Sequence, residues 1–229
     1  MKLLILTAHY PPTGFASPTG WVKEHIASLA SFADIDVVAI FKWLPRINNL
    51  LHNTREWKWF KAIWDLPYKE NPKNNLTVFY RLFFSVPDIV SWKFNQWWLY
   101  IVQRKFISAL CKKNNYDAII VEWMHPCGWL GIKLGQIFNI PVLVVSTEGL
   151  ELLKQYKPRG FKVINKVANH ADYIITLCTT QTIEVKKYCL DKTIIQIPLG
   201  IKKEENNIQP NISNNKKNID LIIVTRLDA

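Results

Sequence analysis

Two kinds of apolar segment alternate along the chain. Short, nearly continuous apolar runs are typical of buried strands, and longer segments with apolar residues three or four positions apart are typical of helices. The runs that predict strands span residues 2–8, 36–41, 117–122, 141–146, 172–177, 193–197 and 219–225. The segments that predict helices span residues 21–32, 88–113, 128–138, 161–170 and 180–188. Strand and helix therefore alternate through most of the sequence.

This alternation predicts an α/β fold with a doubly wound, mostly parallel, Rossmann-like sheet ordered about the first strand. The strands are apolar at nearly every position, which fits burial on both faces under crossover helices. Residues 1–201 form the predicted domain. Residues 42–87 are aromatic, basic and irregular, and their pattern gives no clear assignment.

The C-terminal stretch has a different composition. Residues 202–218 are polar and rich in Asn, which predicts a surface linker. Residues 219–229 begin with an apolar run that no helix follows. We interpret this run as the first strand of a second domain that is truncated at Ala229.

The charge balance is strongly basic. The 229 residues include 29 Lys or Arg and 18 Asp or Glu, which gives a net charge of +11. Such a charge attracts nucleic acid, an anionic membrane surface or the phosphates of a nucleotide, and it does not choose among them. Because no nucleic-acid motif is present and the charge is spread over several segments, we expect no nucleic-acid partner.

Cysteine spacing argues against a zinc-binding protein, and hydropathy argues against a membrane-spanning protein. Cys111, Cys127, Cys178 and Cys189 form no CxxC pair and no zinc-like cluster with His, so we expect unpaired thiols in a reducing cytoplasm and no metal site. No uncharged apolar run reaches the roughly 18 to 20 residues that a membrane-spanning helix needs.

The loops that follow the predicted strands hold the candidate chemistry, because ligands of open parallel sheets bind beyond the carboxyl ends of the strands. The first loop carries Gly14 and Gly20 without a G-x-G-x-x-G motif, and it either lets backbone N–H groups approach an anion or is an ordinary turn. Glu122, Glu148 and Glu151 follow later strands. Their carboxylates suit acid/base or hydroxyl-binding roles, and they suit helix capping equally well.

A series of short motifs resembles glycosyltransferase family 4. The motifs occur in the family's order: YPP at 10–12 with Gly20, His25 and Leu29-Ala30, then YDAIIVEW at 116–123 with Pro126 and Gly128, NIPV at 139–142, ADYIIT at 171–176, IPLGI at 197–201 and VTRLD at 224–228. Each motif is weak alone, whereas the ordered series covers nearly the whole chain and is fairly specific.

The resemblance implies the GT-B arrangement, in which two Rossmann-like domains face each other across a cleft. It implies that this chain is the N-terminal, acceptor-binding part of a retaining glycosyltransferase, and that a C-terminal domain binds the nucleotide-sugar donor. The acceptor would be a saccharide or a lipid-linked acceptor in polysaccharide or cell-envelope synthesis. The nucleotide sugar would be a co-substrate, and no cofactor is expected.

The same resemblance, with the strand-end loops, gives the expected site. We expect Glu122 and Glu148 to be catalytic. The expected acceptor-binding residues are Tyr10, Gly20, Trp21, Trp123, His125 and Glu151. The expected donor-binding residues are Gly14, Gly20 and Arg226, of which Arg226 occupies the position of the arginine that clamps the leaving diphosphate.

Several positions depart from the family pattern. Glu122 stands where the family has His before Trp, Ile120 replaces an earlier His, and Leu199 replaces Asn. The family's Lys and two Glu residues that engage the donor would lie beyond Ala229. We therefore expect the isolated chain to be inactive without a second domain or a partner chain. The alternative is a non-catalytic carbohydrate- or lipid-binding Rossmann module.

Aromatic and basic residues are interleaved in one region. Seven of the ten tryptophans lie between Trp43 and Trp98, among several Lys and Arg residues, and residues 97–102 are apolar all round the predicted helix. This mixture suits an anionic membrane surface, a single-stranded nucleic acid or a subdomain core with a solvated basic face. With the lipid-linked acceptors of the resembling family, it favours a cytoplasmic protein that is peripheral at the inner face of the membrane.

Overall fold

The computed structural model describes residues 1–11, 20–43, 66–84, 92–146, 159–187, 189 and 191–198. The chain divides into two compact units, Met1–Leu199 and Gly200–Ala229, and every described residue belongs to the first. The predicted linker at 202–218 and the predicted strand at 219–225 lie outside the described residues, so both stay predictions.

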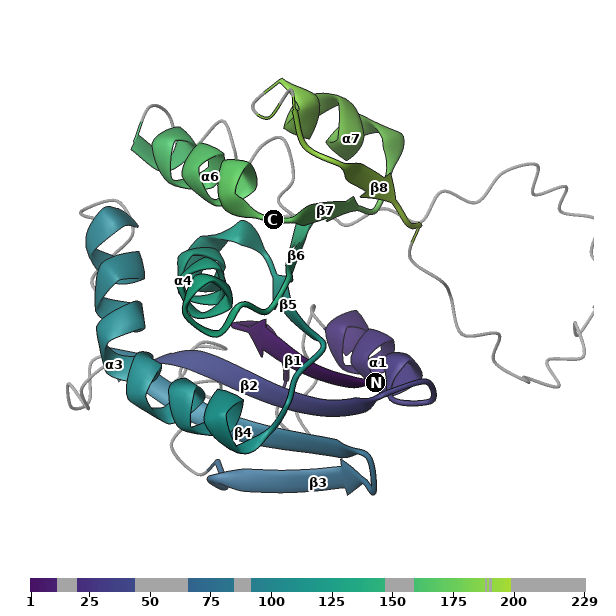
Figure 1. Cartoon of the computed structure of the whole chain (residues 1–229), viewed down its shortest axis with the longest axis vertical. Coiled ribbons are helices and arrows are strands. Elements are labelled where there is room, and N and C mark those ends of the chain that lie inside the picture. Colours follow the sequence, from purple (N-terminus) through teal and green to yellow (C-terminus); the bar gives the residue numbers. More distant parts are fainter. Residues whose placement is uncertain are drawn as a thin grey trace, which may run out of the picture. The chain divides into compact units, whose positions relative to one another are not determined.

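One sheet of eight strands runs through the described part of the chain, in the order β3-β4-β2-β1-β5-β6-β7-β8 (Figure 1). All neighbouring strands are parallel except β3 and β4. From β1 the chain first builds outward through β2 and then, on the other side, from β5 to β8. This is a doubly wound, mostly parallel sheet, so the predicted fold class is confirmed. The strands are β1 (Lys2–Thr7), β2 (Asp34–Trp43), β3 (Lys69–Lys73), β4 (Leu76–Phe84), β5 (Ala118–Glu122), β6 (Val142–Ser146), β7 (Tyr173–Thr176) and β8 (Ile194–Gln196).

Five α-helices and one π-helical turn accompany the sheet in the described residues. They are α1 (Gly20–Leu29), α3 (Trp92–Lys113), η1 (Met124–Gly128), α4 (Trp129–Phe138), α6 (Arg159–His170) and α7 (Thr179–Lys186). None of these helices is long and apolar enough to cross a membrane.

The central strand β1 shows why the sheet is covered on both faces. Successive side chains of a strand point to opposite faces. Leu4 and Leu6 join a core cluster that contains residues of α3, α4 and α6, whereas Leu3 and Ile5 join a second cluster with Ile26 of α1. Both faces are apolar and dry, which is why the sequence of this strand shows no alternation.

Helix α4 approaches the sheet through two glycines. A Cβ atom on Gly131 would lie 2.3 Å from Cγ2 of Val121 on β5, and a Cβ atom on Gly135 would lie 2.3 Å from Cγ2 of Val142 on β6. Real Cβ contacts are longer than this, so the glycines set the distance between α4 and the sheet. Asn139 ends the helix in a left-handed conformation, with a φ of 52°.

The structure adds two strands that the sequence pattern did not predict. Strand β3 has the polar sequence KENPK and is mostly exposed, so it carries no apolar signal. Strand β4 follows it as the second strand of an antiparallel hairpin and pairs in parallel with β2 over Ile35 to Trp43. This long pairing also explains why β2 runs from Asp34 to Trp43 rather than over the predicted residues 36–41.

A hydrogen-bonded cluster satisfies the polar side chains at the amino edge of the sheet. Tyr116 OH donates to Oδ2 of Asp36 at 2.6 Å, and Nδ2 of Asn114 donates to the same oxygen at 3.3 Å. Nζ of Lys2 lies 3.6 Å from that oxygen. Burial and the bond to Asp36 raise the pKa of Tyr116, so its hydroxyl remains a donor. Buried polar groups at this edge are thus paired within the protein.

Gly131→Ala should lower the free energy of unfolding by about 1–3 kcal/mol, because the added Cβ forces α4 away from Val121. The higher helix propensity of Ala offsets at most about 1 kcal/mol of this loss. Chemical denaturation followed by far-UV circular dichroism measures the change. Gly20→Ala is the matched control, since a Cβ there meets nothing within 4 Å in the part of the chain that the structure describes. Equal stability of the two variants would contradict this account of the packing.

Candidate functional site

The carboxyl edge of the sheet brings together polar residues from β1, β5 and α1. Strands β1 and β5 are parallel neighbours in which Leu6 pairs with Val121, so Thr7 and Glu122 follow side by side. Glu122 shares the face of Ile120, which belongs to the core cluster beneath α1. The chain reverses its winding direction between these two strands, and open α/β sheets bind their ligands at such a point.

Glu122 is a buried acid beside a partly exposed imidazole. The Glu122 side chain is 0% exposed, and Nδ1 of His25 lies 3.4 Å from its Oε1, whereas 32% of the His25 side chain is exposed. A carboxylate without water or a partner is costly to bury. The imidazole of His25 contacts this carboxylate. The two side chains thus connect a buried acid to the protein surface.

Buried polar atoms without a hydrogen-bond partner gather at this edge. Among the described residues they include Tyr10 OH, Nδ1 of His25, both carboxylate oxygens of Glu122 and Nε1 of Trp123. Native proteins leave few buried polar atoms unpaired, and a bound ligand is one explanation for a local group of them. The group contains both donors and acceptors, which suits a polyhydroxylated ligand. At the amino edge, in contrast, the buried polar groups are paired within the protein.

Trp123 is held in an unusual backbone conformation next to Glu122. Its φ of 75° is uncommon for a residue other than glycine, and such residues cluster at functional sites. Its ring stacks on the ring of His9, with 3.6 Å between centroids and 30° between planes. Burial, together with the charge of Lys42, lowers the pKa of His9 to about 4. The stacked wall beside Glu122 is therefore uncharged at neutral pH.

Two lysines bring positive charge to the same region. Nζ of Lys23 on α1 lies 5.7 Å from the ring centroid of Tyr10, and Lys42 acts on His9 from the end of β2. Tyr10 is fully buried, and burial together with the charge of Glu70 raises its pKa to about 12. Its hydroxyl remains protonated at neutral pH. Positive charge near unpaired donors suits a ligand that carries phosphate.

The strands farther from β1 contribute neutral groups. The hydroxyl oxygens of Thr176 and Thr182 are 2.6 Å apart, and Oε1 of Gln181 accepts a hydrogen bond from the backbone N–H of Leu177 at 2.8 Å. These bonds tie the first turn of α7 to the end of β7. Their partners lie within the protein, so we assign them to the structure of this turn.

The structure describes six of the predicted site residues: Tyr10, Gly20, Trp21, Glu122, Trp123 and His125. The other four, Gly14, Glu148, Glu151 and Arg226, lie outside the described residues and stay predictions. Trp21 packs against the apolar cluster beneath α1, and His125 is half-buried in η1. Gly20 begins α1, and no atom of the described residues lies within 4 Å of the position that its Cβ would take.

Sequence reasoning did not select His25 or His9 as site residues. His25 precedes Ile26, which is buried, so it lies on the flank of the apolar face of the predicted helix. His9 follows β1 directly, in a loop that the parallel-sheet rule places on the ligand side. These two positions are the sequence signals that could have identified His25 and His9 as site residues. Neither position shows which side chain the histidine contacts.

Metal and thiol chemistry find no support in the described ranges. No group of three or more metal-ligating side chains occurs there. The four cysteines are unpaired, and Cys178 is the exposed one. Burial raises the pKa of Cys111 to about 11 and that of Cys127 to about 12, so these two thiols stay protonated at neutral pH.

Comparison with solved structures relates the fold to sugar-transferring enzymes. Sucrose-phosphate synthase of Thermosynechococcus elongatus matches with a TM-score of 0.56 at 15% identity, over 88% of this chain and 91% of that one. Arabidopsis thaliana UGT89C1 complexed with UDP-L-rhamnose matches with a TM-score of 0.50 at 14% identity, over 90% of this chain. An E. coli trehalose-6-phosphate synthase bound with UDP-2-fluoro glucose matches with a TM-score of 0.50 at 11% identity, over 88% of this chain.

The present chain spans 50% of the UGT89C1 chain and 49% of the E. coli chain. Neither a family model nor a curated protein matches the sequence. At these identities the similarity shows the fold, which is the Rossmann-like fold of GT-B glycosyltransferases.

Stability should fall as the pH drops from 6.5 toward 4. The folded-state pKa of His9, about 4, lies below the ordinary histidine value of 6.5, so the unfolded chain binds more protons in this interval. Urea denaturation across this range should therefore show a steeper loss of unfolding free energy in the wild type than in His9→Phe. Phe retains an aromatic ring against Trp123 but does not titrate. Equal slopes for the two proteins would refute the assignment of this pH dependence to His9.

Proposed function

We propose that this chain is the N-terminal, acceptor-side domain of a retaining glycosyltransferase. The enzyme would move a sugar from a nucleotide-sugar donor to a saccharide or lipid-linked acceptor in polysaccharide or cell-envelope synthesis. The observation that carries the proposal is the group of unpaired buried polar atoms at the carboxyl edge of a GT-B-type sheet. Two of the similar solved structures hold a UDP-sugar or an analogue, which supports a nucleotide-sugar donor here.

His25 and Glu122 would act as a pair on the acceptor. The Nδ1 atom of His25 faces Glu122, which leaves Nε2 to accept a hydrogen bond from an acceptor hydroxyl. Glu122 would orient His25, and its unpaired carboxylate oxygens would accept a hydrogen bond from an acceptor hydroxyl. Tyr10 OH and Nε1 of Trp123 would donate hydrogen bonds nearby. His125, Glu148 and Glu151 complete the proposed acceptor side.

The donor phosphates would lie over the N-terminus of α1. In the proposal, Gly14 and Gly20 would allow close approach to backbone N–H groups, and the helix dipole would favour an anion there. Lys23 and Lys42 add positive charge at the same edge. Arg226 would clamp the leaving diphosphate, with the remaining donor contacts from a C-terminal domain or a partner chain. No further cofactor is part of the proposal.

We propose in addition that the protein is cytoplasmic and peripheral at the inner face of the membrane. The net charge of +11 and the exposed aromatic residues of α3, Phe94 and Trp97, support this placement. A lipid-linked acceptor would be held at that surface.

One observation favours a second candidate function. Glu122 is inaccessible and stands where the resembling enzymes have His, as expected if the site binds a carbohydrate or lipid without turnover. The coding sequence downstream of Ala229 tests the two candidates most simply. A continuing reading frame that encodes a Lys and two spaced Glu residues supports the enzyme, and a stop codon favours the binding module or a partner chain.

The isolated 229-residue chain should show no sugar transfer, because the proposal assigns most groups that stabilise the leaving diphosphate to a C-terminal domain or a partner chain. Each such group typically contributes several kcal/mol, on the order of 3, to lowering the barrier. The measurement is the release of UDP or GDP from a panel of UDP- and GDP-sugars, with a lipid extract as the acceptor source. Sugar transfer by this chain alone would contradict the proposal that a C-terminal domain or a partner chain supplies most of the donor contacts.

In the protein that joins this chain to a donor-binding domain, His25→Asn and Glu122→Gln should each lower kcat by about 100-fold. The double variant should be no slower than either single variant, since the two side chains are in contact and act as one unit. The melting temperature should barely change. Glu24→Gln, at the exposed neighbouring position on α1, is the control and should keep full activity. Full activity of Glu122→Gln with a lowered melting temperature would make Glu122 a structural residue.

A further inference from the structure

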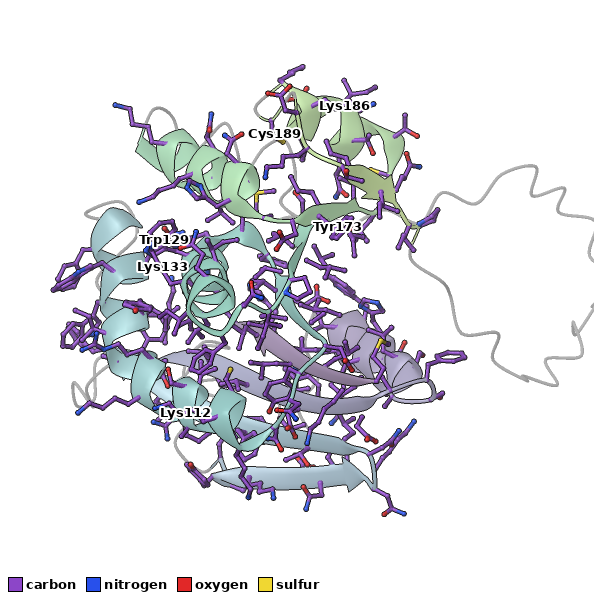
Figure 2. The ribbon with its side chains drawn as sticks, viewed as in Figure 1. Lys112, Trp129, Lys133, Tyr173, Lys186 and Cys189 are labelled. Atoms are coloured by element: carbon purple, nitrogen blue, oxygen red, sulfur yellow. The ribbon has the colours of Figure 1, made fainter. Side chains whose placement is uncertain are left out.

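A concave surface lies in the helix layer on the face of the sheet opposite α1. Helices α3, α4 and α6 contact one another and border a hollow of about 550 Å³. We call it the basic groove and define it by its four cations and two of its aromatic residues: Arg104, Lys133, Lys162, Lys166, Trp97 and Trp129. Figure 2 shows Trp129 and Lys133 extending from α4 on the side that faces α3.

Helical periodicity explains why these residues line one surface. Trp97 and Arg104 are two turns apart on α3, Trp129 and Lys133 are one turn apart on α4, and Lys162 and Lys166 are one turn apart on α6. The opposite side of α6 carries Ile164, Val167 and Ala168, which are buried in the core. The amphipathic packing that covers the sheet therefore directs these polar residues outward together.

The charge of the groove is unbalanced. The sequences of α3, α4 and α6 contain nine Lys or Arg residues and no Asp or Glu. No acidic side chain lines the hollow among the described residues. Surface helices usually mix both signs, because unlike charges three or four residues apart stabilise a helix and like charges destabilise it. Three acid-free helices around one hollow favour an anionic ligand.

Two details indicate that the groove is preorganised to bind an anion. Nζ of Lys166 lies 3.6 Å from the ring centroid of Trp129 and Nζ of Lys133 lies 4.7 Å from it, so the indole holds two cations beside the hollow. Gln96 also lines the hollow; it is 5% exposed, and its Nε2 has no hydrogen-bond partner among the described residues. A buried N–H donor without an acceptor suits an oxygen of a phosphate group.

The rim of the groove is apolar and exposed. Trp97 is 53% exposed and Phe94, one turn earlier on α3, is 39% exposed. Their ring centroids are 6.1 Å apart. A soluble phosphate compound has no need of exposed aromatic rings beside its site, whereas a lipid surface accommodates Trp and Phe at the depth of its headgroups.

We propose that the basic groove binds the phosphate headgroup of an anionic phospholipid and so docks the chain on a membrane. The four cations and the Gln96 amide would contact phosphate oxygens, and Trp97 with Phe94 would enter the interfacial layer. This inference rests on the membrane part of the proposed function, to which it assigns a surface. It is independent of whether the carboxyl edge transfers sugar.

The test is co-sedimentation of the 229-residue chain with vesicles of phosphatidylcholine, with and without phosphatidylglycerol. The wild type should bind the anionic vesicles and bind less as salt increases. Lys133→Glu combined with Lys162→Glu should weaken binding by at least about tenfold, since each basic residue near an anionic surface contributes severalfold or more. This variant retains Lys166 against Trp129. The matched control, Lys112→Glu with Lys113→Glu, changes the net charge equally at the far end of α3, away from Trp129 and Lys133 (Figure 2).

The control pair should keep binding within about threefold of the wild type. Equal losses in both double variants would overturn the groove assignment and leave a diffuse charge effect. No vesicle binding by the wild type would overturn the membrane placement as well. Saturable binding of inorganic pyrophosphate, lost in the groove variant and without any vesicle binding, would also overturn the proposal, because the ligand would then be soluble. If the double variant unfolds in a thermal melt, Lys162→Glu against Lys112→Glu gives the same comparison at exposed positions.

Discussion

The burial of β1 and β5 on both faces is the constraint on which the rest of the structure depends. Neither strand has a solvent face, so its polar side chains occur where the strand ends. Glu122 is the last residue of β5, and Thr7 is the last residue of β1. Helix α1 must cover one face to keep the strands dry, and this packing brings His25 within 3.4 Å of Glu122. The candidate site is thus a consequence of how the core is closed.

The two edges of the same sheet treat their polar groups differently. At the amino edge, Asp36 accepts from Tyr116 and Asn114, so the buried oxygen is paired and the cluster stabilises the fold. At the carboxyl edge, the oxygens of Glu122 and the Nε1 atom of Trp123 lack hydrogen-bond partners among the described residues. A fold tolerates the free-energy cost of unpaired groups where a ligand completes them. The polar groups of the amino edge thus stabilise the fold, and those of the carboxyl edge form the candidate site.

The fold was more predictable from the sequence than the site. Buried parallel strands have a strong apolar signal, so the class and winding of the sheet could be predicted, whereas the polar strand β3 gave none. The rule for open sheets located the edge that holds Glu122 and Trp123. It could not pair Glu122 with His25, because that contact depends on how α1 is rotated over β5. The basic groove likewise needs three helices that are far apart in sequence to pack together.

Chain connectivity limits how far apart the two proposed sites can be. Glu122 ends β5 and Trp129 begins α4, so seven residue steps separate the candidate site from the basic groove. Even a fully extended chain spans at most about 25 Å over that distance. Glu122 faces α1, whereas the groove lies in the helix layer on the other face of the sheet. A membrane surface in contact with the groove would therefore hold its headgroups near the carboxyl edge without covering the face that His25 shares with Glu122. An acceptor anchored in that membrane would need only a short polar spacer to reach the site.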